Sequence, residues 1–305
     1  MDIYDVNGSK YTPTETVATV KKTIRILFIG NSLTQDGVAY LPYILKNQYG
    51  SDIDFKFYMW YKGGYTLAQQ YSLFASNGKA EIFSVAENSE SWTNYNNSKT
   101  MSWVLSTYTF DIVCLQEYFN YKESYNNLTD VNNVKDYIIA NYTKNPLEFI
   151  TLFHAPKRSV ADSVFELTKT GNALILSEGV ADDMIPAGIA VYRALSDITL
   201  NALGDQGGLS PDGTHTQEGL PCLLQTWTIL LWLLNRLGMP TAIYGNTFTI
   251  TQAIYNAINV PGANLGSGVI TGSTYQNILA QEYAINAYKE GKQFVIENLH
   301  KELTV

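Results

Sequence analysis

Arg25-Ile-Leu-Phe-Ile-Gly30-Asn31-Ser32-Leu33-Thr34 is a short apolar run that ends at a glycine and is followed two residues later by a serine. The run predicts a buried strand over residues 24–29. A strand that ends at Gly-x-Ser places the serine hydroxyl on a tight turn at the carboxyl end of a sheet. In open α/β folds, ligands bind at this edge of the sheet. We therefore take Ser32 as the first candidate functional residue.

The rest of the chain alternates between strand patterns and helical patterns. We expect five strands, over residues 24–29, 53–60, 110–116, 148–153 and 183–186. A weaker alternation, over residues 78–97, is typical of a hairpin. The expected helices cover residues 38–49, 66–74, 131–142, 163–178, 189–203, 217–237, 252–258 and 275–299. Strands that alternate with helices predict an α/β fold, a parallel sheet covered by helices on both faces.

The same patterns predict the domain organisation. Residues 1–21 are polar and aperiodic, which indicates an N-terminal arm. The alternation of strands and helices covers residues 22–240 and then stops. We expect residues 241–305 to form a C-terminal helical extension. No long Pro- or Ser-rich linker precedes it, so we treat residues 22–305 as a single domain.

The composition argues against several classes of protein. The chain has 305 residues, 46% of them hydrophobic, which is typical of a globular protein. A net charge of −8 argues against a nucleic-acid-binding surface. The longest apolar stretch, residues 220–237, contains Gln, Thr, Asn and Arg side chains. It therefore predicts a buried helix rather than a membrane span.

The chain shows no signal-peptide pattern at its start. Its 22 tyrosines and many asparagines are compatible with the surface of a secreted, carbohydrate-handling protein. We therefore expect a periplasmic or secreted protein whose signal peptide is absent from this chain. A cytoplasmic location stays open, and so does the oligomeric state.

Cysteines and histidines are scarce. Two cysteines, Cys114 and Cys222, cannot build a disulfide framework or a Cys-rich zinc site. Cys114 lies inside a strand pattern, where we expect a buried free thiol. Three histidines in the whole chain argue against a multi-histidine metal centre. We expect neither a metal nor a cofactor.

Four of the expected strands are followed by residues that chemistry could use: Ser32, Gly64, Gln116 and His154. The carboxyl ends of parallel strands meet at one edge of a sheet, so these residues should lie near one another. The backbone N–H groups of Ser32 and Gly64 and the side-chain amide of Gln116 could stabilise an oxyanion.

A serine hydroxyl is a weak nucleophile unless a neighbouring base accepts its proton. The segment Ser210-Pro-Asp-Gly-Thr-His215 offers His215 as that base. Asp212, three residues earlier, could hold the imidazole in the correct tautomer and stabilise its cation. We therefore predict a Ser32–His215–Asp212 triad.

These residues form four ordered blocks: Gly30-Asn31-Ser32-Leu33, Gly63-Gly64, Leu115-Gln116 and Asp212-x-x-His215. Together they resemble the blocks of the SGNH, or GDSL-type, hydrolases over roughly residues 22–240. The resemblance implies a three-layer α/β/α, flavodoxin-like fold with a parallel five-stranded sheet. It also implies that Ser32 is the nucleophile, Gly64 an oxyanion donor, His215 the base and Asp212 its orienter.

The chain departs from the family pattern at two positions. Asn31 stands where the family usually has Asp, and Gln116 stands where it usually has Asn. The phrases around Asp183–Gly188 and Leu115–Glu117 resemble a branch of uncharacterised bacterial SGNH-like proteins. Many of those proteins occur in gut Bacteroidetes beside carbohydrate-degrading enzymes.

Three further residues are candidate substrate contacts: Asn31, His154 and Arg158. His154 follows an apolar strand and fits a packed structural residue equally well. Arg158 fits a solvated surface charge better than an anion clamp.

The residues and the resemblance together predict a serine esterase. It would remove acetyl or other small acyl groups from a small-molecule or glycan ester through an acyl-enzyme. Two alternatives stay open. A carbohydrate-binding or scaffold protein with little turnover is suggested by Gln116 and the tyrosine-rich composition. A lipid-ester hydrolase would need an apolar acyl groove, and the sequence offers no obvious lid helix for one.

Overall fold

The computed structural model describes residues 3–4, 10–11, 21–116, 128–154, 162–203, 209–212, 215–258 and 268–299. This part of the chain folds as α/β, which confirms the predicted class. Within the predicted arm, β1 (Ile3–Tyr4) and β2 (Lys10–Tyr11) form a two-stranded antiparallel ladder.

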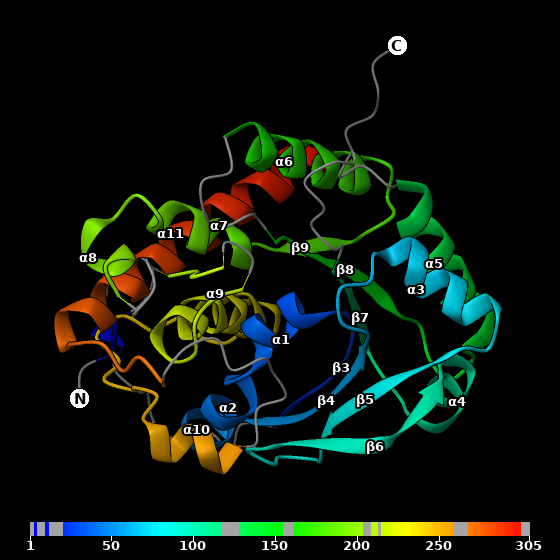
Figure 1. Cartoon of the computed structure of the whole chain (residues 1–305), viewed down its shortest axis with the longest axis horizontal. Coiled ribbons are helices and arrows are strands. Elements are labelled where there is room, and N and C mark those ends of the chain that lie inside the picture. Colours follow the sequence, from blue (N-terminus) through cyan, green and yellow to red (C-terminus); the bar gives the residue numbers. More distant parts are fainter. Residues whose placement is uncertain are drawn as a thin grey trace.

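A second, larger sheet lies at the centre of the molecule (Figure 1). Its strands are β3 (Lys22–Gly30), β4 (Ile53–Tyr61), β5 (Lys79–Val85), β6 (Trp92–Thr100), β7 (Ile112–Leu115), β8 (Glu148–Leu152) and β9 (Asp183–Ile185). They lie in the order β6-β5-β4-β3-β7-β8-β9. Pairing is parallel from β4 through to β9 and antiparallel from β4 through β5 to β6.

The predicted sheet of five parallel strands is therefore incomplete, because the observed sheet is mixed and has seven strands. The added strands β5 and β6 pair as the hairpin expected over residues 78–97. Between β4 and β5 the only helix is α3 (Leu67–Ala75). β5 starts beside the end of β4 and runs antiparallel to it, with Glu81 opposite Tyr61.

Helices cover both faces of the sheet (Figure 1). Besides α3, they are α1 (Ser32–Val38), α2 (Leu41–Tyr49), α4 (Met101–Thr107), α5 (Leu128–Asn141), α6 (Asp162–Ser177), α7 (Ala187–Ala194), α8 (Ile198–Asn201), α9 (Leu220–Arg236), α10 (Gln252–Ile258) and α11 (Thr274–Asn298). On one face, α9 packs against α1, α7 and α11, and on the other α3 packs against α5.

Two predicted helices differ from the observed ones. The helix expected over residues 38–49 is α2, which begins at Leu41, and α1 before it was not predicted. Pro42 in the first turn of α2 has no N–H with which to continue α1. The helix expected over residues 189–203 is α7 followed by α8. Asp197 caps α8 by accepting hydrogen bonds from the N–H groups of Thr199 and Leu200. The short helix α4 was not predicted.

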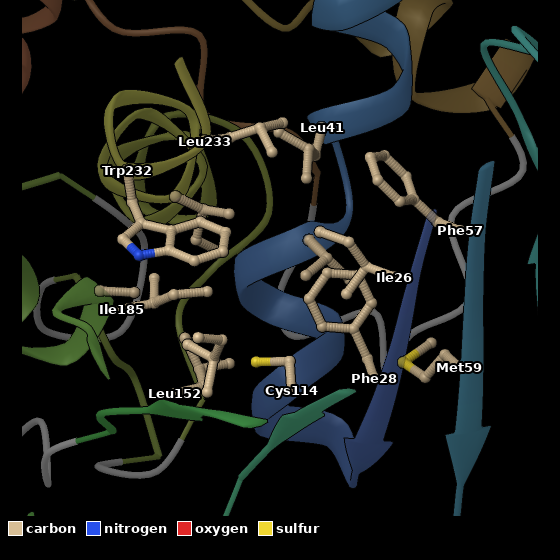
Figure 2. Packing of buried hydrophobic residues seen from close by; sticks show 14 of the residues in the cluster. Ile26, Phe28, Leu41, Phe57, Met59, Cys114, Leu152, Ile185, Trp232 and Leu233 are labelled. Carbon is tan, nitrogen blue, oxygen red and sulfur yellow. The ribbon is translucent and has the colours of Figure 1, made fainter. Parts of the chain in front are cut away.

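Helix α9 forms the centre of the core on its face of the sheet. Every residue from Leu220 to Leu234 is buried, as predicted for this apolar stretch. Figure 2 shows side chains from four strands and from α9 in one cluster: Ile26, Phe28, Cys114, Leu152, Ile185 and Trp232. Cys114 is a buried free thiol, as expected, and burial raises its pKa. In the part of the chain that the structure describes, no helix is both long and apolar enough to span a bilayer.

The C-terminal helix α11 packs on α7 and α9 and also contacts the edge strand β9. Its close approach to the sheet depends on Gly291. A side chain at this position would overlap the ring of Pro186, which directly follows β9. The contact shows how the C-terminal helix is held against the core.

We expect Gly291→Ala to destabilise the fold by about 1–3 kcal/mol through overpacking, although alanine is the better helix former. Denaturant unfolding would measure the loss. Lys289→Ala, on the exposed side of the same helix, should be nearly neutral. Equal stability of the two variants would contradict the packing role of Gly291.

Candidate active site

The predicted site residues follow neighbouring strands of the sheet. Ser32 begins α1 just after β3, and Gly64 lies in the loop after β4. Gln116 follows β7, and His154 lies just beyond β8. Because β4, β3, β7 and β8 are adjacent and parallel, all four residues lie at the same edge of the sheet.

Ser32, His215 and Asp212 form a chain of hydrogen bonds. The Ser32 Oγ lies 2.6 Å from the His215 Nε2. The His215 Nδ1 lies 2.7 Å from the Asp212 Oδ2, and the His215 backbone N–H donates to the Asp212 Oδ1 over 2.7 Å. A carboxylate only accepts, so the ring proton belongs on Nδ1, and Nε2 can accept from the serine hydroxyl. The structure thus brings together the three residues of the predicted triad.

Asn31 holds the turn before Ser32. Its side-chain oxygen caps α1 by accepting the Leu33 N–H over 3.0 Å. Its Nδ2 donates over 3.1 Å to the carbonyl oxygen of Tyr65, in the loop after β4. The side chain is 0% exposed. Both ends of its amide are therefore used inside the protein, where they hold this turn. A contact between Asn31 and substrate stays a prediction.

Gly64 lies in a tight turn beside Ser32. The Tyr65 N–H donates to the carbonyl oxygen of Lys62, and Gly64 has φ +69°. A β-turn with positive φ at its third residue strongly favours glycine there. Among the described residues, apart from its two chain neighbours, none has a heavy atom within 4 Å of the position that a Gly64 side chain would take.

Gln70 of α3 links the ends of β3 and β4, and sequence reasoning missed it. Its Nε2 donates to the Gly30 carbonyl oxygen over 3.0 Å, and its Oε1 accepts the indole N–H of Trp60 over 2.8 Å. The Lys62 N–H also donates to the Gly30 oxygen. A signal was present, because Gln70 occupies a buried position of an otherwise amphipathic helix.

Gln116 is 1% exposed, and its side chain is oriented by Thr34. The Thr34 hydroxyl donates to the Gln116 Oε1 over 3.0 Å. Both groups need the glycine at position 30, since a side chain there would overlap Thr34 Oγ1 and lie 3.0 Å from Gln116 Oε1. Because the Gln116 Oε1 accepts from Thr34, it is the oxygen of the amide, and not its N–H groups, that faces Thr34. Thr34 is a second residue that sequence reasoning missed.

Two predicted substrate contacts remain, His154 and Arg158. His154 is buried at the end of β8, two strands from β3. Arg158 lies outside the described residues. Both stay predictions. Among the residues that the structure describes, no three His, Cys, Asp or Glu side chains are grouped so that they could hold a metal ion.

Glu218 is a buried acid three residues after His215. Its Oε2 accepts the Tyr40 O–H over 2.8 Å, and the Tyr40 oxygen accepts the Gly219 N–H over 2.8 Å. Burial raises the pKa of Glu218 from 4.5 to about 7; the hydrogen bond from Tyr40 opposes this rise, and the charge of Asp36 adds to it. The acid therefore holds its proton more tightly in the folded chain than in the unfolded chain.

No protein-family model and no curated protein sequence matches this chain. Solved structures that match it include the following two. A DUF4886 family protein from Bacteroides uniformis has a TM-score of 0.60 at 16% identity, over 93% of this chain and 99% of that one. The C-terminal catalytic domain of Streptococcus pneumoniae peptidoglycan O-acetyltransferase A has a TM-score of 0.26 at 7% identity, over 92% of this chain and 97% of that one. At 16% identity, the likeness to the Bacteroides protein shows a shared fold.

We expect the free energy of unfolding to depend on pH through Glu218. Since the pKa is raised on folding, the folded state binds more protons between pH 4.5 and about 7, and stability falls as pH rises through this window. Glu218→Gln cannot ionise but can still accept from Tyr40. Its stability relative to the wild type should increase by up to about 3 kcal/mol across the window.

Denaturant unfolding at about pH 5 and about pH 8 would measure this difference. Glu87→Gln, at an exposed position, is the matched control and should follow the wild-type pH profile. Parallel profiles for Glu218→Gln and the wild type would contradict the raised pKa of Glu218.

Proposed function

We propose that this protein is a serine esterase that removes acetyl or other small acyl groups from carbohydrates. One observation carries the proposal: the continuous chain of hydrogen bonds from Ser32 Oγ through His215 to Asp212, with separations of 2.6 and 2.7 Å. Such a chain supplies a nucleophile, a base within reach of its proton, and a group that orients the base.

In the first half of the proposed reaction, Ser32 Oγ attacks the carbonyl carbon of the ester. His215 Nε2 takes the hydroxyl proton, and Asp212 stabilises the resulting imidazolium through Nδ1–H. The tetrahedral intermediate then collapses. The bond between the carbonyl carbon and the sugar oxygen breaks, and His215 returns the proton to the leaving alkoxide, which departs as the alcohol.

The second half releases the acyl group from Ser32. Water attacks the acyl-enzyme while His215 takes one of its protons. The second tetrahedral intermediate collapses to the free acid, and the proton on His215 returns to Ser32 Oγ. No external acid, base or cofactor is needed to balance either half.

The negative charge that forms on the carbonyl oxygen needs hydrogen-bond donors. We assign this role to the backbone N–H groups of Ser32 and Gly64 and to the side-chain amide of Gln116. Three observations support the assignment. Asn31 ties the Gly64 loop to the Ser32 turn, no described residue beyond its chain neighbours comes within 4 Å of a Gly64 side-chain position, and Thr34 holds the oxygen end of the Gln116 amide.

The strand order supports an SGNH-type assignment. The five mutually parallel strands lie in the order β4-β3-β7-β8-β9, which is 2-1-3-4-5 when they are numbered along the chain. This order is typical of flavodoxin-like folds. Together with the four sequence blocks, it favours the SGNH hydrolases as the family, and their carbohydrate-associated bacterial branch favours acylated glycans as substrates. For the same reason we propose a periplasmic or secreted location.

We expect Ser32→Ala to abolish both hydrolysis of p-nitrophenyl acetate and labelling by a fluorophosphonate probe. The reason is that the variant lacks the oxygen that forms the acyl-enzyme. Ser72→Ala, on α3 and away from the site, is the matched control and should behave like the wild type.

Equal rates and equal labelling in the wild type and Ser32→Ala would rule out this mechanism. A wild-type protein that binds glycans on an array, but hydrolyses none of a panel of acetylated glycans, would instead favour a carbohydrate-binding protein. Preferential hydrolysis of long-chain esters would favour a lipid-ester hydrolase.

Gln116→Met should lower kcat about 100- to 1000-fold, because it removes one oxyanion donor while keeping the length of the side chain. It also removes the partner of the Thr34 hydroxyl. Thr34→Val loses the same Thr34–Gln116 hydrogen bond but keeps the amide, so it should cost less than about tenfold. Similar kcat values for the two variants would show that Gln116 orients the site rather than stabilising the oxyanion.

A further inference from the structure

Ser32 is the first of three residues, spaced four apart, that contact the segment from His215 to Gly219. Ser32 is hydrogen-bonded to His215, and Asp36 to Thr216. Tyr40 is hydrogen-bonded to Glu218 and Gly219. Residues four apart in a helix lie on one face, and Tyr40 continues this row just beyond α1. The segment that carries the proposed base is therefore held along one side of the helix that carries the proposed nucleophile.

The contact between Asp36 and Thr216 is the one nearest to His215 after Ser32 itself. The Asp36 Oδ2 accepts the Thr216 backbone N–H over 2.7 Å and the Thr216 hydroxyl over 3.2 Å. The same hydroxyl accepts a hydrogen bond from Gln225 Nε2 of α9 over 2.8 Å. Thr216 is buried, so its backbone is held between α1 and α9, one peptide away from His215.

The other contacts of His215 do not determine how far it lies from Ser32. Asp212 belongs to the same loop, so its two hydrogen bonds set the orientation of the imidazole within that loop. Ser210 is local as well, since its hydroxyl donates to the His215 carbonyl oxygen over 2.6 Å. A hydrogen bond to another element is needed to place the loop against α1.

We infer that Asp36 is a positioning residue for His215, an assignment that rests on the proposed function of Ser32 and His215. Its carboxylate fixes the Thr216 backbone on α1 and so keeps the His215 Nε2 within reach of the Ser32 hydroxyl. In this role Asp36 acts through Thr216, to which its carboxylate is hydrogen-bonded, and not on the ester itself. Tyr40 supplies a second anchor further along the segment, at Gly219 and Glu218.

The test compares Asp36→Ala and Asp36→Asn with the wild type. In each protein, the time course of fluorophosphonate labelling gives a rate constant for Ser32 and a final extent. A misplacement of about 1 Å can cost about 100-fold, so Asp36→Ala should label about 10- to 100-fold more slowly but to the same extent. Asp36→Asn keeps an oxygen that accepts the Thr216 N–H, and it should recover most of the rate.

Asp197→Ala is the matched control, because Asp197 also accepts two backbone N–H groups but caps α8, away from Ser32. It should label at the wild-type rate. The inference is overturned if Asp36→Ala keeps the wild-type rate, or if it loses only extent. It is also overturned if Asp36→Asn is as slow as Asp36→Ala.

A second measurement separates failure of this inference from failure of the proposed function. If the wild type is neither labelled nor active, the esterase proposal fails. Crystal structures of three proteins, the wild type, Asp36→Asn and Asp36→Ala, would then still decide the role of Asp36. We expect the Ser32 Oγ to His215 Nε2 separation to stay at 2.6 Å in the wild type and near that value in Asp36→Asn. In Asp36→Ala it should exceed hydrogen-bonding range. An unchanged separation in Asp36→Ala would overturn the inference.

Discussion

The missing side chain at Gly30 allows several segments of the chain to meet at the end of β3. The space that a Cβ would occupy is taken by Thr34 Oγ1, with Gln116 Oε1 close by. On the backbone side, the Gly30 carbonyl oxygen accepts from Lys62 N–H and from Gln70 Nε2. One position thus brings together the start of α1, the end of β7 and the loop after β4, the elements that carry three of the proposed catalytic groups. A larger residue there would force these elements apart.

Buried amides and hydroxyls hold most of this arrangement together. Asn31, Gln70 and Gln116 are all almost fully buried, and each makes a hydrogen bond to a different segment of the chain. A neutral hydrogen bond adds only about 1 kcal/mol, but a buried group left without a partner costs about 1–3 kcal/mol. Such networks therefore favour a single arrangement, which suits a site that must hold a hydroxyl and an imidazole within 2.6 Å.

The sequence predicted the parallel strands better than it predicted the complete sheet. Hydrophobic runs are local signals, so residues 24–29, 53–60, 110–116, 148–153 and 183–186 could be recognised as strands one at a time. The pairing of β5 and β6 with β4 depended on the direction in which the chain leaves α3, which a local pattern does not show. The helix over residues 38–49 was recognised and corresponds to α2, but α1, which carries Ser32, was not predicted.

The sequence by itself determined the local parts of the candidate site. The Gly-x-Ser turn after an apolar strand and the Asp212–His215 pair, three residues apart, both depend on near neighbours. Only the tertiary structure decided that Ser32 and His215, 183 positions apart, lie within a hydrogen bond of each other. It also revealed the hydrogen bonds from Thr216 to Asp36, from which we infer that Asp36 positions His215. The physical reason is that these distances depend on the order of the strands and on the packing of α1 against α9, which no short segment encodes.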